Sequence, residues 1–570
     1  MSLVWPAWTL PVLLTGVGLR MPGAQVPDSA TLRRGAERAQ VVFERTRPAF
    51  LPTVLGHRGG PCDEQIGRFC YWHEDSPDPP PAESRRITEA RDTLIAALAA
   101  AAAALPGDPW IAGQQVRYLI EAGRLGEALE AARACRALPW WCEALAGLTL
   151  HAAGAFPSAD SVYQQAARDM PAEVRCEWGD VAPLLERALR RRYERLPCPE
   201  RAAFETRLWW LAQPLYSRPG NDRRTEHWAR VTMTHLVEHA STPYAVRWGD
   251  DLRELTLRYG WPVYWTQEPP RVGDLGAPGV TGHDAAPGWR FVPASRTFLV
   301  PESSGADDWA LARSFPRERY APSWATSLSA LDAAISRFRR GDTSVVVAAY
   351  DLRRDPHFML AHLDAALVLA RDEATAPVIV ERRGGSPAGV LVARAIWEPR
   401  LVSVEVTATA HHRLARARAG VLPMPRPERG VSGSDLLLFD PPDSLPQTFV
   451  TVLPYVRGPS AVRSDSRLGL FWELYGLPAT GEAVTTTVTV TPAGGGWLRR
   501  LSEGVGLARH RTPLHLEWQE VVTPVGGVAA RALALELQHL SPGRYQIGVA
   551  VRPPGQEPAT SVREIDVVAR

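Results

Sequence analysis

The hydrophobic pattern of this 570-residue chain changes its period near Ser327, and this change limits the fold more than any single motif does. Before it, apolar residues recur at the three-to-four-residue spacing of amphipathic helices. After it, short runs alternate at period two between turn residues, as in Val484-x-Thr486-x-Val488-x-Val490. The sequence therefore predicts a multidomain α+β protein, with helices first and antiparallel β-sandwiches after them.

Two predicted helical hairpins follow one another at a fixed spacing. They turn at Gly123 and Gly154, which are 31 residues apart, close to the 34-residue period of tetratricopeptide repeats. Residues 82–175 are therefore predicted to form tetratricopeptide-like hairpins, which stack because each has an apolar face that only a neighbour can bury. Such an array either offers a groove to a partner protein or packs against the next module of its own chain. The sequence leaves both possibilities open.

Proline, glycine and charge mark the other boundaries. Residues 3–19 are apolar and lead to Ala24, where a secretory signal would be cut; a buried N-terminus is the alternative. A helix is predicted from Pro183 to Arg195, with arginines on a solvated face. The predicted domains are a signal peptide over 1–24, an arm with a disulfide loop over 25–81, the hairpins over 82–175, an α/β module over 176–265, a Pro/Gly-rich linker over 266–326, and β-sandwiches over 327–459 and 460–570.

The six cysteines all precede residue 200 and occur as close neighbours along the chain. An even cysteine set in an exported chain indicates disulfides, and the spacings do not match the Cys-x2-4-Cys of zinc sites. Six reduced thiols in a cytosolic protein are the alternative. Fifteen connectivities are possible; the sequential one closes the shortest loops and pairs Cys62 with Cys70, Cys135 with Cys142, and Cys176 with Cys198.

Composition excludes several functions. A net charge of +2 argues against a nucleic-acid partner, which would require a concentrated basic surface. The chain contains no lysine, so a phosphate-loop lysine, a Schiff base and a Ser-Lys nucleophile are impossible. After the N-terminal stretch, no run approaches the ~18 apolar residues of a membrane helix.

Between Arg201 and Trp265, aromatic, acidic and glycine residues follow a distinctive order. An aromatic pair precedes a proline, an asparagine turn opens an arginine-containing helix, and a tryptophan with two aspartates leads to Tyr-Gly-x-Pro. The residues concerned are Trp209, Trp210, Pro214, Asn221, Arg230, Trp248, Asp250, Asp251, Tyr259, Gly260 and Pro262.

This order resembles that of the bacterial proteins named for a Gly-Trp-x-Thr-Asp (GWxTD) motif. The chain departs from the family at Gln213, Arg247 and Asp250, which replace an Asp, the leading Gly and the Thr of the motif. The segments 434–438 and 470–477 are also similar to strands of the β domain that commonly follows the module. The resemblance implies a divergent member with this α/β module, and no established chemistry comes with it.

One short motif could carry catalysis. His235-Leu236-Val237-Glu238-His239 fits the His-x-x-Glu-His pattern of inverted zinc peptidases. On a helix, His235 and His239 share a face and could hold zinc while Glu238 activates a bound water. A solvated polar helix face explains the same residues without a metal.

The leading prediction is an exported, non-enzymatic cell-envelope protein without a cofactor. It would bind other envelope proteins through its helical repeats or its β-sandwiches. Two alternatives come from other classes: the zinc-dependent hydrolase, and a carbohydrate-binding protein whose aromatic residues stack on sugars. The aromatic residues of the second alternative are Trp248, Tyr259, Trp261 and Trp265.

Overall fold

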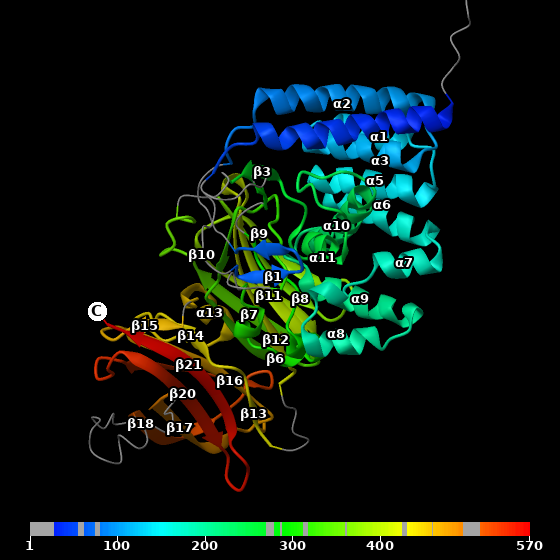
Figure 1. Ribbon diagram of the computed structural model, residues 1–570. Helices are drawn as coiled ribbons and strands as arrows, with labels where there is room; N and C mark the ends of the chain where they lie inside the picture. The colour runs from blue at the N-terminus through cyan, green and yellow to red at the C-terminus, as the bar shows by residue number, and fades with distance from the viewer. Residues whose placement is uncertain are drawn as a thin grey trace, which may run out of the picture.

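The computed structural model describes residues 28–54, 62–73, 80–268, 279–284, 288–311, 317–359, 362–424, 430–458, 460–493 and 514–569. The predicted signal peptide and the predicted boundary between the sandwiches at Pro459 lie outside these residues. Helices fill the N-terminal half and strands the C-terminal half (Figure 1), which confirms the predicted fold class. The helices are α1 Ser29–Thr46, α2 Arg85–Ala104, α3 Pro109–Glu121, α4 Leu125–Ala134, α5 Pro139–Ala152, α6 Phe156–Asp169, α7 Ala172–Trp178, α8 Arg187–Glu194, α9 Cys198–Ala212, α10 Asp222–Glu238, α11 Asp250–Tyr259, α12 Ser295–Leu299 and α13 Phe449–Val452.

The two predicted hairpins are present as α3–α4 and α5–α6, and they turn in the same way. Gly123 and Gly154 adopt φ of 71° and 72°, a left-handed conformation that glycine reaches without steric cost. The residue after each glycine donates its N–H to a carbonyl five positions earlier, at 2.9 Å in both turns. This is the Schellman end of a helix, and its recurrence explains the 31-residue spacing.

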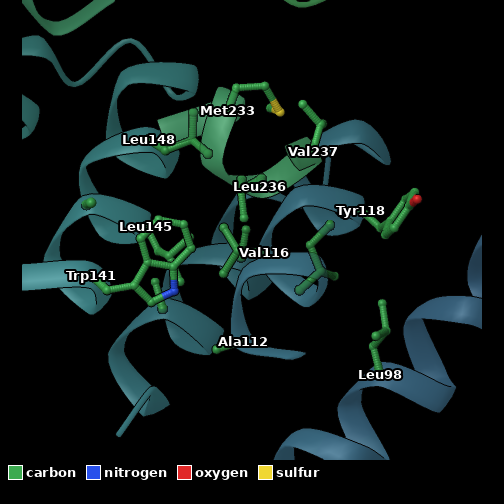
Figure 2. Packing of buried hydrophobic residues seen from close by; sticks show 14 of the residues in the cluster. Leu98, Ala112, Val116, Tyr118, Trp141, Leu145, Leu148, Met233, Leu236 and Val237 are labelled. Carbon is green, nitrogen blue, oxygen red and sulfur yellow. The ribbon is translucent and has the colours of Figure 1, made fainter. Parts of the chain in front are cut away.

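Helix α10 packs on one face of these hairpins, where it contacts α3, α5 and α6. Figure 2 shows Leu236 and Met233 of α10 among Val116, Leu145 and Leu148 of the hairpins. We call the face of the hairpins that receives α10 the groove. The hairpins therefore serve as a packing platform for the next part of the chain, the second of the two roles that the sequence left open.

In the described ranges, the strands form four larger sheets and two two-stranded sheets, β1-β2 and β3-β4. In strand order, sheet 1 is β5-β12-β11-β8-β9, sheet 2 is β10-β7-β6, sheet 3 is β13-β16-β14 with β19 paired to β16, and sheet 4 is β15-β21-β20-β17-β18. The strands are β1 Glu64–Ile66, β2 Phe69–Tyr71, β3 Tyr264–Gln267, β4 Val280–His283, β5 Ser327–Ala330, β6 Ala333–Arg340, β7 Thr343–Asp351, β8 Leu363–Ala370, β9 Val378–Gly385, β10 Ala388–Ile396, β11 Arg400–Ala408, β12 Arg413–Val421, β13 Ser432–Gly433, β14 Leu437–Phe439, β15 Ala461–Arg463, β16 Arg467–Tyr475, β17 Glu482–Pro492, β18 Leu514–Val522, β19 Val528–Glu536, β20 Gly543–Arg552 and β21 Ala559–Val568.

The four sheets stack as consecutive layers, because separate apolar cores lie on both faces of sheets 2 and 3. On β7, Val346 and Ala348 face the core shared with sheet 1, whereas Val345 and Val347 face the core shared with sheet 3. This two-sided burial explains the uninterrupted apolar run of β7. Sheet 4 buries one face only, so β17 alternates between buried and half-buried residues.

The strand pairing crosses the predicted boundary between the sandwiches. Strands β13 and β14 precede Pro459, yet both pair with β16, which follows it. The second sandwich therefore takes its first strands from residues 432–439.

The segment predicted as a linker supplies core side chains. Trp289, Phe291, Phe298, Trp309 and Tyr320 are buried between the module helices and sheet 1. The part described over 266–326 is irregular, as predicted, but it is an integral layer of the fold.

The predicted helix from Pro183 to Arg195 is shorter in the structure. Pro183 lies in a 3-10 turn over Ala182–Leu184, and Leu185 and Glu186 are extended before α8 begins at Arg187. The Glu186 carboxylate accepts hydrogen bonds from Arg290 and from the Ser295 N–H, which hold this break in place.

Candidate functional site

The GWxTD-like motif residues join helices to one another. Asn221 caps α10: its side-chain oxygen accepts the Arg224 N–H at 3.0 Å, and its amide group donates to the Trp209 carbonyl at 2.7 Å. One side chain thus fixes the start of α10 against the end of α9. The Trp209 ring lies 4.9 Å from the His227 ring of α10, so the aromatic pair is part of the same joint.

The first turn of α10 buries charges deep in the molecule. Arg223 and Glu318 form an ion pair at 2.9 Å with side chains 0% and 1% exposed. Glu318 also accepts the N–H groups of Phe291 and Val292. Burial raises the pKa of Asp222, which accepts hydrogen bonds from Tyr320 and Trp324. These groups are enclosed by protein, and their geometry is that of a structural network.

Arg230 acts at the other end of the module. Its guanidinium donates to the carbonyls of Leu257, Arg258 and Arg319, the last two at 2.7 and 2.6 Å. Two of these carbonyls end α11, where a cation is favourable to the helix dipole. Gly260 follows with φ of 97°. Pro262 packs beside it, against Gly282 of β4.

Two further motif residues, Asp251 and Tyr259, hold the disulfide-closed β1–β2 hairpin. Asp251 accepts three hydrogen bonds from Arg68, which lower the pKa of the carboxyl. The Tyr259 ring stacks on Tyr71 at 3.7 Å, and its hydroxyl donates to Glu64 at 2.6 Å. The motif therefore binds the β1–β2 hairpin, which lies nearly 200 residues earlier in the chain.

The His235-x-x-Glu238-His239 motif is the C-terminal turn of α10 in the groove. His235 stacks on Trp178 with 4.8 Å between ring centroids, and its Nδ1 lies 3.7 Å from Glu238. Gln114 and Trp110 of α3 donate to the carbonyls of Leu236 and His239. Within the described ranges, no three His, Cys, Asp or Glu side chains converge as a metal site would need. The His235 ring and the carbonyls at the helix end are packed against other helices, so this turn is not simply a solvated face, and the packing favours a structural role over a zinc centre.

The aromatic residues of the glycan alternative pack against one another. The Trp261 and Trp265 rings are 5.5 Å apart, Tyr244 lies 4.8 Å from Trp265, and Arg117 covers Trp261. Tyr259 and Trp265 are buried, while Trp248 and Trp261 are half-buried. Sugar stacking requires an open aromatic face, and these rings are occupied by protein.

All six cysteines pair in the predicted sequential order. Cys62–Cys70 closes the β1–β2 hairpin, Cys135–Cys142 joins α4 to α5, and Cys176–Cys198 joins α7 to α9. Disulfides are typical of proteins that fold in an oxidising compartment.

The joint between the module and sheet 1 was not predicted. Glu405 of β11 accepts the N–H groups of Tyr216 and Ser217, and the buried Arg416 and Arg418 of β12 donate to carbonyls at the end of α9 and to Pro214. Burial, followed by the positive charge of the neighbouring Arg418, lowers the pKa of Arg416 to about 9. The available signal was a glutamate among the valines of a buried strand.

A cavity of about 300 Å³ opens beside the module. Glu205 lies next to its wall: its carboxyl accepts the Tyr193 hydroxyl at 2.7 Å. Burial, with the neighbouring Asp180 charge, raises the pKa of Glu205 to about 7. The cavity is lined by Asp180, Ala182, Pro183, Arg190, Glu194, Arg201, Asp250, Arg253, Glu254 and Leu257.

Neither protein-family models nor curated proteins match this chain. Among solved structures, it is similar to a 1.5-MDa bacterial ice-binding adhesin (10% identity, TM-score 0.14), to a tetra-tandem repeat from the extending region of a large adhesion protein (11%, 0.14) and to the FN1–FN3 domains of chicken CNTN1 (11%, 0.15). The matches cover 42%, 44% and 54% of this chain, and 66%, 51% and 78% of those chains. At these values they decide nothing about function, and the fold class rests on the layers described above.

Proposed function

We propose that this chain is an exported cell-envelope protein that works by binding other proteins. The observation that carries the proposal is the filled groove: α10 covers the face of the helical hairpins that could have received a partner, which leaves the β-sandwiches as the proposed partner surface. Three disulfides support an oxidising compartment. None of the described helices combines the length and hydropathy needed to cross a membrane.

Strand β18 is the best candidate for the partner surface. It forms one edge of sheet 4, and edge strands offer backbone groups to a strand of another chain. Val521 near its end and Val525, just after it in the connection to β19, are 70% and 85% exposed. The edge strand β9 of sheet 1 carries Glu381, Arg382 and Arg383, more of the charge that discourages pairing than Glu517 and Glu520 of β18.

Site-specific crosslinking in the native cell tests this proposal. A photoreactive residue at Val521 or Val525 should yield adducts with an envelope protein. The same residue at Val42 of α1, which is 63% exposed, should yield none. Adducts at Val42 alone, or retention of the chain in the cytoplasm with reduced cysteines, would contradict it.

The likeness of residues 176–265 to the GWxTD family supports the envelope context and remains a prediction. The zinc hydrolase and the glycan binder have less support, because their residues are engaged in protein contacts. Zinc analysis on protein purified without chelator, beside a His235→Ala variant, separates the hydrolase from the proposal. Stoichiometric zinc that disappears in the variant would favour the hydrolase.

A further inference from the structure

Helix α8 concentrates positive charge in a chain that is almost neutral. Five of the nine residues from Arg187 to Arg195 are arginines, whereas the whole chain has a net charge of +2. The module's joints use none of these five side chains. A local excess of this size requires its own explanation.

The arginines are arranged as a stripe. Leu189 and Tyr193, four residues apart, are buried and fix the inner face of α8. Arg187, Arg191 and Arg195 lie at i, i+4 and i+8 on the opposite side, where all three are exposed. We call these three residues the outer stripe; it is about 12 Å long at 1.5 Å per residue.

No carboxylate neutralises the outer stripe. In the part of the chain that the structure describes, Arg187, Arg191, Arg192 and Arg195 make no ion pair, whereas Arg190 pairs with Glu194 at 2.8 Å. Like charges at i and i+4 destabilise a helix. An anionic surface that covers the stripe would relieve this repulsion.

The surroundings of the stripe favour a flat, phosphate-bearing occupant. Guanidinium groups bind phosphate oxygens in pairs. The only aromatic residue of α8, Tyr193, is buried, so no ring is available to stack on nucleic-acid bases. In the adjacent cavity, the carboxylates of Asp180, Glu194, Asp250 and Glu254 stand beside three arginines, Arg190, Arg201 and Arg253, so the cavity adds no net positive charge that would draw in an acidic peptide.

We propose that the outer stripe docks the chain onto the phosphate groups of an anionic lipid surface. This inference rests on the proposed envelope location. The lipid surface meant here faces away from the cytoplasm, and only an exported chain can reach it. Each arginine near an anionic membrane adds attraction, so the stripe supports weak, salt-sensitive and reversible attachment.

Sedimentation of the full chain with vesicles tests the inference. Vesicles with about 30% phosphatidylglycerol in phosphatidylcholine should bind the chain, and pure phosphatidylcholine should not. Binding should fall as salt rises from about 50 mM to about 500 mM. The triple variant Arg187→Gln, Arg191→Gln, Arg195→Gln should bind about 100-fold more weakly. A triple Arg→Lys variant should keep part of the binding, since it keeps the charge.

The matched control removes three exposed arginines from strands of the sheets, Arg394, Arg467 and Arg552, also by change to Gln. It loses the same charge and should bind as the unmodified chain does. Thermal melting should show all variants folded, because the changed side chains are exposed. Equal loss in the control, no preference for anionic vesicles, or binding to poly-glutamate without binding to vesicles would overturn the inference. The export assay is separate, so an unexported chain that binds vesicles would refute the envelope proposal alone.

Discussion

The helical half and the outermost sandwich are held together by different forces. Around the helices and the module, buried arginines pair with carboxylates or carbonyls, as in Arg117–Glu44, Arg223–Glu318 and Arg418 at the end of α9. In sheet 4 and β19, over the described residues of 482–568, Thr486 is the one buried polar side chain, and the remaining strands of the outermost sandwich add only Ser434 and Glu473. Ion pairs are directional and specify one arrangement, whereas apolar burial tolerates small shifts. Directional ion pairs and hydrogen bonds are therefore found where segments far apart in the sequence come together.

The Arg223–Glu318 pair is the sharpest test of this contrast. Removing one partner of a buried pair costs about 3–5 kcal/mol, because the other charge is left without compensation. Glu318→Leu should cost more than Arg223→Met, since Glu318 also accepts two backbone N–H groups. The double variant should recover only part of the loss.

Urea unfolding followed by tryptophan fluorescence measures these differences. Val488→Ala, in the apolar core of the outer sandwich, is the comparison and should cost about 1–2 kcal/mol. If Glu318→Leu cost no more than Val488→Ala, directional pairing would not distinguish the two regions.

The disulfides offer a second way to separate the regions, because all three lie in the helical half. The chain-entropy model gives about 3.4 kcal/mol for a loop of 22 residues and about 2.5 kcal/mol for one of 8, the separations of Cys176–Cys198 and Cys62–Cys70. The double Ser variant of the first pair should therefore be the less stable. Hydrogen exchange should show loosening of α7–α9 with protection of β17 and β20 unchanged. Equal loosening in both regions would mean that they unfold as one unit.

The groove gives a smaller effect with a matched control. A Cβ at Gly113 would lie 2.5 Å from Leu236 and 3.1 Å from Trp141, so Gly113→Ala should cost about 1–3 kcal/mol through overpacking. Gly35→Ala in α1 meets no atom within 4 Å and should stabilise by up to about 1 kcal/mol. Proteolysis near the end of α10 should rise only in the Gly113 variant. If Gly113→Ala left the free energy of unfolding unchanged, the side chains around the groove would have shifted to make room for the added methyl group.

The sequence contains the local half of this structure. Gly123 and Gly154 predicted the hairpin turns, alternation predicted the strands, and short loops predicted the disulfide pairs, because each signal lies within a few residues of its effect. Arg223 with Glu318 and Glu405 with Tyr216 are 95 and 189 residues apart, and nothing in periodicity links such positions. For the same reason, the sequence could not predict that α10 fills the groove. The His-x-x-Glu-His spacing suggested zinc because it does not reveal that side chains of α3 bond the carbonyls at this helix end.

The last effect depends on pH and acts at Glu205. Its folded pKa of about 7 lies above the ordinary 4.5, so the folded state holds the proton more tightly than the unfolded chain does. The resulting stabilisation is fully present below pH ~4.5 and is lost as pH rises through ~7, up to about 3 kcal/mol. Glu205→Gln should remove this slope between pH ~4.5 and ~7, and Glu200→Gln, at an exposed position of the same helix, should keep it. If melting temperatures measured across this range gave the same slope in both variants, another group would control the titration. Hydrogen exchange can locate the effect. If the pH dependence of protection is confined to α7–α9, the pH sensitivity belongs to the helical half, where carboxyl groups are buried beside one another, and not to the apolar outer sandwich.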